Sequence, residues 1–369
     1  MGIRMRLNMK KQKILIISTV GLIYDGITSV IISYLKAMDT SDLDIYVAGT
    51  INVELRIREQ IEQLGCKVVY FPNRREKTCA YEMSLISFIK ENNIDVVHAH
   101  GNSGTLSIEI LAAWLSGCKK RIVHSHNTKC DQVKADKLLR PIMNLLYTDA
   151  LACGIDAGKW LFGNKRFTVI TNGRDIQHYK FNKLARERIR NEYGIDKELV
   201  IGHVGGFYEQ KNHKYLIEIY RKTAMVYPNT HFFLIGEGPL KEVIKKETGD
   251  LNIHFTGAVD NVEDFLNAMD GMLLPSLFEG LPLVVIEWQI NGLPAVISDN
   301  ISDECIQTGF IKKMPLSVNP QEWANKIIQM IKNNDREMNS ELGSFVIKEK
   351  GYDIKDSAKM LKKLYEDKK

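Results

Sequence analysis

Two glutamates interrupt an apolar stretch at residues 275–294, PSLFEGLPLVVIEWQINGLP. Glu279 and Glu287 lie eight residues apart, and a buried carboxylate is costly unless a partner hydrogen-bonds to it. Pro282 is favoured in the first turn of a helix, and Gly280 suits a tight entry to that turn. The pattern predicts Glu279 on a loop and Glu287 inside a helix, with the amino terminus of the helix between them.

This arrangement suits a particular ligand. The free backbone N–H groups and the partial positive charge at a helix amino terminus favour a phosphate. The stretch from Pro282 to Glu287 spans about 7 to 8 Å along a helix, the size of a small ligand. A phosphate flanked by carboxylates that accept hydrogen bonds from hydroxyls predicts a sugar nucleotide. The alternative is structural: Glu287 pairs with a lysine of the fold, and Glu279 is solvated on its loop.

Length and composition limit the class of protein. A chain of 369 residues exceeds the size of a single hydrophobic core, so two domains are expected. The net charge of +5 is too small to indicate nucleic acid as a partner, although it suits anionic ligands or an anionic membrane surface. The six cysteines are scattered without metal-ligand spacing, which indicates reduced thiols in a cytoplasmic protein.

The N-terminal sequence MGIRMRLNMKKQKILIISTVGLIY resembles a signal peptide, with basic residues before an apolar run. The run ends at Asp25 and Gly26, short of the roughly 20 residues that a membrane-spanning helix needs. A first strand at 13–19 explains the segment better, and no other run is long enough to span a bilayer. Any membrane contact is therefore expected to be peripheral, at the inner face of the plasma membrane.

Short apolar runs alternate with longer stretches of helical period, which indicates βα units and parallel sheets. Strand patterning lapses in a polar stretch after Gly173, where we place the domain boundary. The predicted fold class is α/β, with two doubly wound, Rossmann-like domains facing a central cleft. The predicted domains are residues 1–175 and 176–351, and a C-terminal helix in 352–369 is expected to pack back onto the first. The predicted strands are 13–19, 44–49, 67–72, 95–100, 121–126, 149–154, 167–173, 199–206, 231–238, 253–258, 271–276 and 294–299.

Two predicted strands of the second domain end in small residues. Gly205, Gly206 and Lys211 follow the first of them, and the next ends at Gly236 and Gly238. Glycines let a phosphate approach the backbone, and a lysine neutralises its charge. The segment is neither a P-loop nor GxGxxG.

Two HxH elements end strands of the first domain. His98 and His100 close one strand, and His124 and His126 close the next, so alternation places each pair on one face. Metal binding is one interpretation. We expect instead that the histidines hydrogen-bond a substrate or the backbone, and that the protein holds no metal.

Together these residues resemble the retaining glycosyltransferases of family 4, which have the GT-B fold. The resemblance covers nearly the whole chain, and the closest likeness is to bacterial enzymes of capsular polysaccharide and exopolysaccharide synthesis. It rests on the segments HSHNT, GxxEQKNH, GEGPL and PSLFEGLPLVVIEWQ. The last of these matches the family's pair of glutamates separated by seven residues, at Glu279 and Glu287.

The resemblance implies roles for individual residues. Glu287 holds the ribose hydroxyls of the nucleotide, Glu279 faces the donor sugar, and Lys211 contacts the phosphates. His126 reaches the donor sugar from the first domain, and these implied catalytic residues are Glu279, His126 and Lys211. The remaining implied donor contacts are Gly26 in the loop after the first strand, the backbone amides near Gly280, Leu281 and Pro282, and the backbone from Val259 to Val262 around the base.

One departure from the family concerns the phosphate site. The family usually has an arginine five residues before the lysine, where this chain has Gly206. Arg174, in an NGRD segment where the family usually has an apolar residue, is a candidate replacement. We hypothesise that it contacts the donor phosphates. Gly154, where the family commonly has serine, is a second departure.

The resemblance implies transfer of a sugar, with retention and without a metal or other cofactor, from a UDP-sugar to a saccharide acceptor, often lipid-linked. The basic and apolar stretch 117–146 is expected to contact anionic lipid, or else is a solvated helix face. Two alternatives remain open. One is a nucleotide-sugar epimerase on the same fold, and the other is a catalytically impaired subunit that binds nucleotide sugars.

Overall fold

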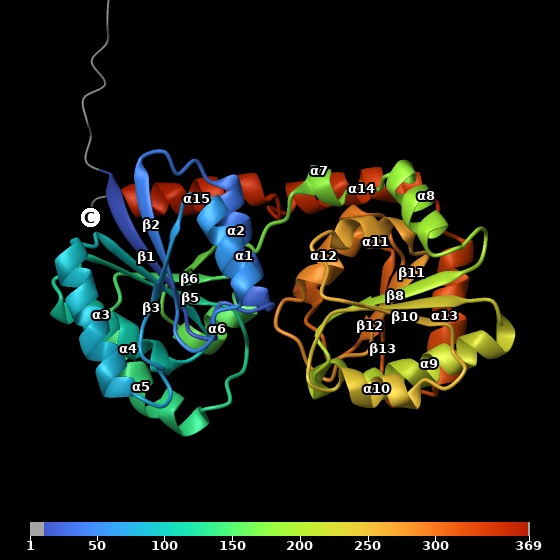
Figure 1. Cartoon of the computed structure of the whole chain (residues 1–369), viewed down its shortest axis with the longest axis horizontal. Helices are drawn as coiled ribbons and strands as arrows, with labels where there is room; N and C mark the ends of the chain where they lie inside the picture. Colours follow the sequence, from blue (N-terminus) through green and yellow to red (C-terminus); the bar gives the residue numbers. More distant parts are fainter. Residues whose placement is uncertain (1–10, 368–369) are drawn as a thin grey trace, which may run out of the picture. The chain divides into compact units, whose positions relative to one another are not determined.

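The computed structural model describes residues 11–367, and the chain divides into two compact units. The N-terminal unit runs to Gly173 and resumes at Ile354, whereas the C-terminal unit spans Arg174–Asp353 (Figure 1). The predicted boundaries at 175 and 351 each lie two residues from this division. The basic residues at the start of the leader-like pattern fall outside the described part of the chain.

The N-terminal unit is built on a seven-stranded parallel sheet of order β3-β2-β1-β4-β5-β6-β7. Its strands are β1 (Gln12–Ser18), β2 (Leu43–Gly49), β3 (Lys67–Tyr70), β4 (Val96–Gly101), β5 (Lys120–Ser125), β6 (Asp149–Ala152) and β7 (Thr168–Val169). Its helices are α1 (Gly26–Ala37), α2 (Leu55–Gln63), α3 (Thr78–Asn92), the 3-10 helix η1 (Gly104–Leu106), α4 (Ser107–Leu115), α5 (Val133–Leu146), α6 (Ile155–Phe162) and, from the end of the chain, α15 (Ile354–Glu366).

The C-terminal unit has a six-stranded parallel sheet of order β10-β9-β8-β11-β12-β13. Its strands are β8 (Val200–Val204), β9 (His231–Ile235), β10 (Ile253–Gly257), β11 (Gly271–Leu274), β12 (Ala295–Ser298) and β13 (Ile311–Met314). Its helices are α7 (Ile176–Tyr179), α8 (Lys183–Glu192), η2 (Glu209–Lys211), α9 (His213–Val226), α10 (Lys241–Glu247), α11 (Val262–Ala268), α12 (Leu283–Ile290), η3 (Asp303–Cys305), α13 (Pro320–Lys332) and α14 (Arg336–Glu349).

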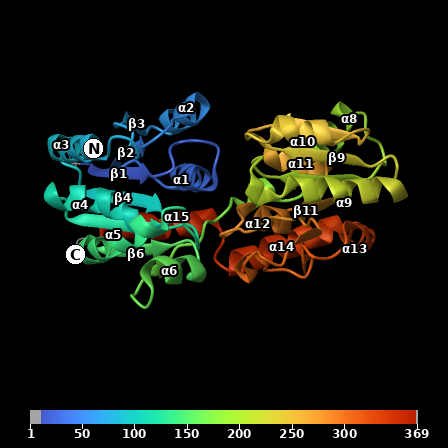
Figure 2. The ribbon, with the colours of Figure 1, turned by 90° about the horizontal axis from the view of Figure 1, so that it is seen from below.

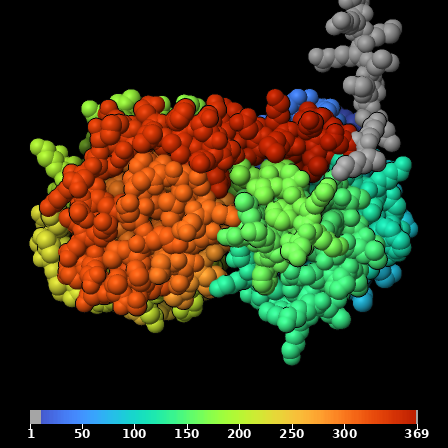
Figure 3. Space-filling model, turned by 180° about the vertical axis from the view of Figure 1, so that it is seen from behind, coloured from blue at the N-terminus to red at the C-terminus, as the bar shows by residue number. Residues whose placement is uncertain are grey.

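Helices cover both faces of each sheet, as Figure 2 shows, because side chains alternate between the faces of a strand. In the C-terminal unit Phe233 and Ile235 of β9 belong to one hydrophobic core, and Phe232 and Leu234 belong to the other. In the space-filling view the last helices of this unit, drawn in red, cover one side of it (Figure 3). A sheet buried on both faces explains the continuous apolar runs in the sequence.

Four elements differ from the sequence prediction. The strand β13 was not predicted, because Lys312 and Lys313 interrupt its apolar pattern, as is common on an edge strand. The strand predicted at 167–173 is reduced to Thr168–Val169. The polar stretch after Gly173 holds α7 and α8, whose amino ends are capped by the side chains of Asp175 and Asn182.

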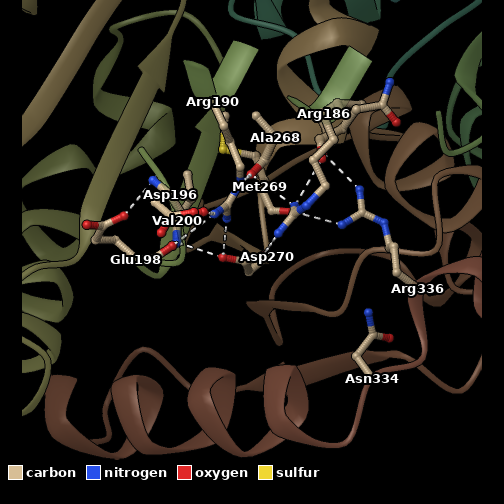
Figure 4. Close-up of polar contacts among 12 residues, drawn as sticks. Arg186, Arg190, Asp196, Glu198, Val200, Ala268, Met269, Asp270, Asn334 and Arg336 are labelled. Atoms are coloured by element: carbon tan, nitrogen blue, oxygen red, sulfur yellow. Dashed lines mark hydrogen bonds and ion pairs between the residues drawn. The ribbon is translucent and has the colours of Figure 1, made fainter. Parts of the chain in front are cut away.

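Three arginines fix the amino ends of β8 and β11. Arg186 and Arg190 bind the two carboxylate oxygens of Asp270 at 2.6 and 2.7 Å, and one of these oxygens also accepts from the amide of Val200 at 2.8 Å (Figure 4). Arg336 donates to backbone carbonyls at the end of α11, and burial lowers its pKa to about 9. The cluster sits where these strands begin, so it aligns them for the loops at their other ends.

The C-terminal helix α15 belongs to the N-terminal unit. The carbonyl of Tyr365 accepts from the Gln12 side chain at 2.8 Å. The buried hydroxyl of Tyr365 lies 2.7 Å from Nδ1 of His98. In the described range, no helix combines the length and the apolar character needed to cross a membrane.

Candidate functional site

The strand order in the C-terminal unit reverses between β8 and β11, which are neighbours. In open parallel sheets ligands bind beyond the carboxyl ends of the strands at such a reversal. The loops after β8 and β11 meet there, because the amide of Leu277 donates to the carbonyl of Gln210 at 2.8 Å. The Gln210 side chain also donates to the carbonyl of Phe278 at 3.0 Å. Two of the predicted site segments are therefore joined directly.

Lys211 and Glu279 form the centre of this junction. Their Nζ and Oε1 atoms lie 2.6 Å apart, with 17% and 7% of the side chains exposed. Oε1 of Glu279 also accepts from the Ser276 hydroxyl at 2.7 Å, and Oε2 accepts from Gln210 at 3.1 Å. Each carboxylate oxygen thus has a protein donor, which satisfies a largely desolvated charge. In this arrangement Glu279 positions the Lys211 ammonium at the edge of the sheet.

Gly236 and Gly238 are required by the close packing of two strand ends, whereas Gly205 borders side chains. A Cβ on Gly236, where φ is +144°, would lie 2.3 Å from the carbonyl oxygen of Gly205. A Cβ on Gly238 would lie 2.6 Å from the amide nitrogen of Phe207, and one on Gly205 would lie 3.2 Å from Cε of Lys211. The structure therefore gives these glycines a packing reason, independent of any phosphate. Their contact with a donor phosphate stays a prediction.

Gly206 is enclosed more loosely. A Cβ there would approach the ring of Tyr208 to 2.7 Å and the carbonyl oxygen of Glu237 to 3.2 Å. Tyr208 is exposed, so the closest contact is with the movable side chain of a surface residue. The family resemblance implies an arginine at this position. This chain has a glycine there, and the ring of Tyr208 lies against it.

Glu287 lies inside α12, about one and a half turns beyond Pro282, which is the N-cap residue and has no N–H of its own. The carboxylate is buried and meets the buried guanidinium of Arg174, with Nε and Oε1 2.6 Å apart. Burial raises the pKa of the nearby Tyr179 hydroxyl, and the charge of Glu287 adds to that increase. Glu287 is thus paired with a cation of the fold, as the structural alternative requires, although the cation is arginine and not lysine.

This pair gives Arg174 a contact that the sequence hypothesis did not include. The sequence hypothesis placed its guanidinium on the donor phosphates as a substitute for the arginine absent at position 206. The structure places its Nε 2.6 Å from Oε1 of Glu287, the residue for which the resemblance implies a ribose contact, and the phosphate contact stays a prediction. The physical reason for the pair is that a carboxylate in a helix packed among buried apolar side chains needs a counter-ion.

The other predicted donor contacts lie on neighbouring segments of the same unit. Leu281, which precedes the N-cap, and the pair Val259 and Val262 after β10 are partly buried and pack against the hydrophobic core. Gly280 is partly exposed on the loop after Glu279. The side chains of these apolar residues are used in packing, so their predicted ligand contacts through backbone groups stay predictions.

The four histidines of the N-terminal unit form one cluster, in which His98, His100 and His124 are buried and His126 is partly exposed. Nε2 of His98 lies 3.2 Å from Nδ1 of His124, and Nδ1 of His100 lies 2.8 Å from Nε2 of His126. Burial lowers the pKa of His126 to about 3 and holds the pKa values of the other three well below their usual range. The predicted placement of each pair on one face is confirmed by the ring contacts, with centroids 4.0 and 4.2 Å apart.

The cluster is the place where the described residues come closest to a metal-ligand set. Ring nitrogens of His98, His100 and His124 lie within 4.8 Å of one another. Hydrogen bonds between the rings and to Tyr365 already account for much of their polar character. The expectation that these histidines hold no metal stays a prediction.

Gly26 is the first residue of α1 in the N-terminal unit. The preceding Asp25 caps the helix, because its Oδ1 accepts from the amide of Thr28 at 2.8 Å. A Cβ on Gly26 would meet no atom within 4 Å, so the glycine is not required by packing. Its predicted contact with the donor phosphate stays a prediction.

Three residues that hold the site together were not predicted from the sequence. Gln210 and Ser276 stand directly beside residues of the recognised segments, and their polar side chains were a usable signal. Tyr179 gave no such signal, because it lies in the polar stretch read as a domain boundary.

Comparisons with known proteins agree with this geometry. Residues 198–333 match the family described as glycosyl transferases group 1. EpsF of Bacillus subtilis, named as a glycosyltransferase, is 31% identical over 326 residues, which cover 83% of this chain and 85% of EpsF. CapH of Staphylococcus aureus, named as a capsular polysaccharide biosynthesis glycosyltransferase, is 25% identical over 323 residues, which cover 80% of this chain and 86% of CapH.

Solved structures show the same fold. The crystal structure of Alr3699/HepE from Anabaena, in complex with UDP and glucose, superposes with a TM-score of 0.78. The match covers 96% of this chain and 99% of that protein, at 18% sequence identity. The predicted fold class is therefore confirmed as the two-sheet GT-B type, and the chain belongs to the group 1 glycosyltransferases.

Proposed function

We propose that this chain transfers a sugar from a UDP-sugar to a saccharide acceptor in the synthesis of a surface polysaccharide. The observation that carries the proposal is the Lys211–Glu279 pair at the reversal point of the C-terminal sheet, next to the amino terminus of α12. A cation and a set of helix N–H groups suit a diphosphate. The complex of HepE with UDP and glucose, and the name of CapH, support the choice of donor and of product class.

In this proposal the bond between the anomeric carbon and the UDP oxygen breaks, and the acceptor oxygen forms a bond to the same carbon on the same face. The negative charge that develops on the leaving diphosphate is stabilised by Lys211 and by the N–H groups at the start of α12. The acceptor proton leaves with the diphosphate. These groups supply the charge stabilisation without a metal, so we propose metal-independent transfer.

The test is a thermal-shift and titration panel of UDP-, GDP- and ADP-sugars on the wild-type protein and on Glu287→Ala. We expect stabilisation by UDP-sugars, and loss of at least about tenfold in affinity in the variant. Glu341→Ala is the matched control, because this glutamate pairs with Lys180 on the exposed surface of the same unit. If no nucleotide sugar of the panel stabilises or binds the wild-type protein, the donor assignment is contradicted.

A second candidate is a subunit that binds nucleotide sugars and has lost transfer activity. The observation that favours it is Gly206, where Tyr208 occupies the space beside the backbone and the family's arginine is absent. Release of free UDP in the presence of saccharide acceptors, measured by a coupled assay, would exclude this candidate. Release of a changed nucleotide sugar without any acceptor would instead indicate an epimerase.

We also propose that the acceptor is lipid-linked and that α5 meets the membrane surface. Leu138 and Leu145 on α5 are 75% and 82% exposed, and Lys134 and Lys137 are exposed on the same helix. Residues of green shades, which include α5, form much of the N-terminal unit's face seen in Figure 3. An exposed apolar and basic face suits anionic lipid.

Three of the basic residues predicted for this surface have other roles. Lys120 donates to the carbonyls of Leu364 and Asp367, and Arg121 donates to that of Leu146 at 2.7 Å. Arg140 binds Asp136 at 2.6 Å. The lipid contact is therefore proposed for the exposed face of α5 alone. Co-sedimentation with phosphatidylglycerol vesicles should fall severalfold in Leu138→Ser/Leu145→Ser, and equal sedimentation of variant and wild type would contradict the contact.

A further inference from the structure

Arg174 stands at the point where the chain enters the C-terminal unit. It is the first residue of that unit, and its amide donates to the carbonyl of Tyr352 at 2.8 Å. It also forms a parallel bridge with Asp353, the last residue of the same unit. On its other side Asp175 caps α7, accepting from two amides of that helix. The backbone of Arg174 is therefore fixed by its neighbours on both sides.

The side chain of Arg174 is fixed as well. The arginine is 3% exposed and Glu287 is 5% exposed, and they meet at 2.6 Å although they lie 113 positions apart in the chain. Glu287 projects from a helix whose neighbouring residues Ile286 and Trp288 are fully buried. A carboxylate in such surroundings keeps a defined orientation only when a charged donor holds it.

A carboxylate that accepts from a ribose must present its oxygens in a fixed plane, because the hydrogen bonds to two neighbouring hydroxyls are directional. A guanidinium holds a carboxylate plane better than an ammonium does, since its N–H donors are themselves fixed in a plane. Arg174 engages Oε1 of Glu287, and the hydroxyl of Tyr179 interacts with the same carboxylate. These contacts hold the carboxylate from the protein side.

We infer that Arg174 is a positioning residue for ribose recognition: it holds Glu287 so that the carboxylate accepts from the nucleotide's ribose hydroxyls, while it makes no phosphate contact of its own. The inference rests on the proposed function, which assigns the ribose to Glu287. It ties the selectivity for a ribonucleotide to the residue at which the chain enters the C-terminal unit.

The experiment compares two ligands by calorimetric titration: UDP, and 2′,3′-dideoxy-UDP, which lacks both ribose hydroxyls. The proteins are the wild type, Arg174→Met, Arg174→Lys and the double variant Arg174→Met/Glu287→Gln. In the wild type we expect UDP to bind at least about tenfold more tightly than the dideoxy analogue. In Arg174→Met this preference should fall to about twofold or less, while affinity for the analogue changes little.

The double variant separates positioning from stability. It removes the unpaired buried charge that Arg174→Met leaves behind, so its melting temperature should recover relative to Arg174→Met. Its preference for UDP should not recover, because the ribose carboxylate is gone. Arg174→Lys, which keeps the charge but loses the planar donor, should retain stability and show an intermediate preference.

Three results would overturn the inference. An equal loss of affinity for both ligands in Arg174→Met and Arg174→Lys would show a phosphate contact. An unchanged preference in these variants would show that Arg174 does not orient Glu287. A preference that returns in the double variant would show a purely structural pair. If the wild type binds the two ligands with equal affinity, the proposed ribose site itself fails, which is a different outcome.

Discussion

The two sheets of this protein share one strand order, and the carboxyl ends of their strands differ in chemistry. In the N-terminal unit β4 and β5 end in four hydrogen-bonded histidines, whose pKa values are held low by burial. In the C-terminal unit the loops after β8 and β11 meet through the ion pair of Lys211 and Glu279. The fold supplies the same edge twice, and the side chains placed on it decide which edge suits an anionic ligand.

The largest effect is expected from Lys211→Met. Removing the cation should lower the rate of transfer about 100-fold or more, because a preorganised charge stabilises the leaving diphosphate. The rate is measured by UDP release at saturating acceptor. Lys313→Met is the control, since Lys313 also pairs with a carboxylate, Asp303, in the same unit at 2.9 Å.

The double variant Lys211→Met/Glu279→Gln refines this prediction. It relieves the unpaired carboxylate and should regain melting temperature without regaining transfer. If transfer activity returns in the double variant, the ion pair only stabilises the fold. The difference between the histidine cluster of the N-terminal unit and the Lys211–Glu279 pair would then have no functional role.

Gly236→Ala tests the packing beneath the charged edge. The new Cβ would meet the carbonyl oxygen of Gly205 at 2.3 Å in a conformation that L residues rarely adopt, so unfolding free energy should fall by about 3 kcal/mol. Gly309→Ala, with open space around the new methyl, should change it by less than about 0.5 kcal/mol. Urea unfolding measures both, and equal values would show that the strand ends can separate at little cost.

Acid should destabilise both edges, with a sign that follows from their histidines. Burial lowers the pKa of His126 to about 3 and that of His213 to about 4, from an ordinary 6.5, so the unfolded chain binds more protons between these values. Unfolding free energy should therefore fall as the pH drops from 7 to 5, by about 2 kcal/mol for each such histidine. Below the folded-state pKa the loss should level off.

Hydrogen exchange followed by mass spectrometry at pH 7 and pH 5 separates the units. The strands β4 and β5, with three such histidines and His126 directly after β5, should lose more protection than β8, which carries His203 alone. His213→Phe should reduce the pH dependence of the C-terminal unit and leave that of the N-terminal unit unchanged. Equal protection at both pH values would contradict the neutral, buried state of these rings.

The smallest effect is expected from metal removal. Transfer should change by less than about twofold in EDTA, because Lys211 and the amino terminus of α12 supply the charge that a metal would otherwise provide. Loss of activity in EDTA, restored by Mn²⁺ or Mg²⁺, would overturn the metal-independent mechanism.

Most of the fold could be predicted from the sequence, because strands buried on both faces leave continuous apolar runs. The strand β13 was not predicted because two lysines break its apolar pattern. The helices α7 and α8 were not predicted because exposed helices at a domain boundary have few apolar residues in a periodic pattern. These are places where tertiary packing, and not local periodicity, decides the structure.

The site was predictable where its partners lie in recognisable segments. Lys211 and Glu279 follow neighbouring strands, so their approach agrees with the topology. The pairing of Arg174 with Glu287 was missed, because residues 113 positions apart share no local pattern and a departure from the family at position 206 suggested another role for the arginine. The position of Glu287 in an apolar run indicated that a cation pairs with its carboxylate. The sequence pattern did not identify that cation.

The central claim is that the reversal point of the C-terminal sheet holds the donor nucleotide. Hydrogen–deuterium exchange of the full chain with and without UDP tests it most directly. The account predicts that UDP slows exchange in residues 205–212 and 276–290 and that this protection is lost in Lys211→Met. Protection confined to the histidine edge of the N-terminal unit, or none at saturating UDP, would contradict it.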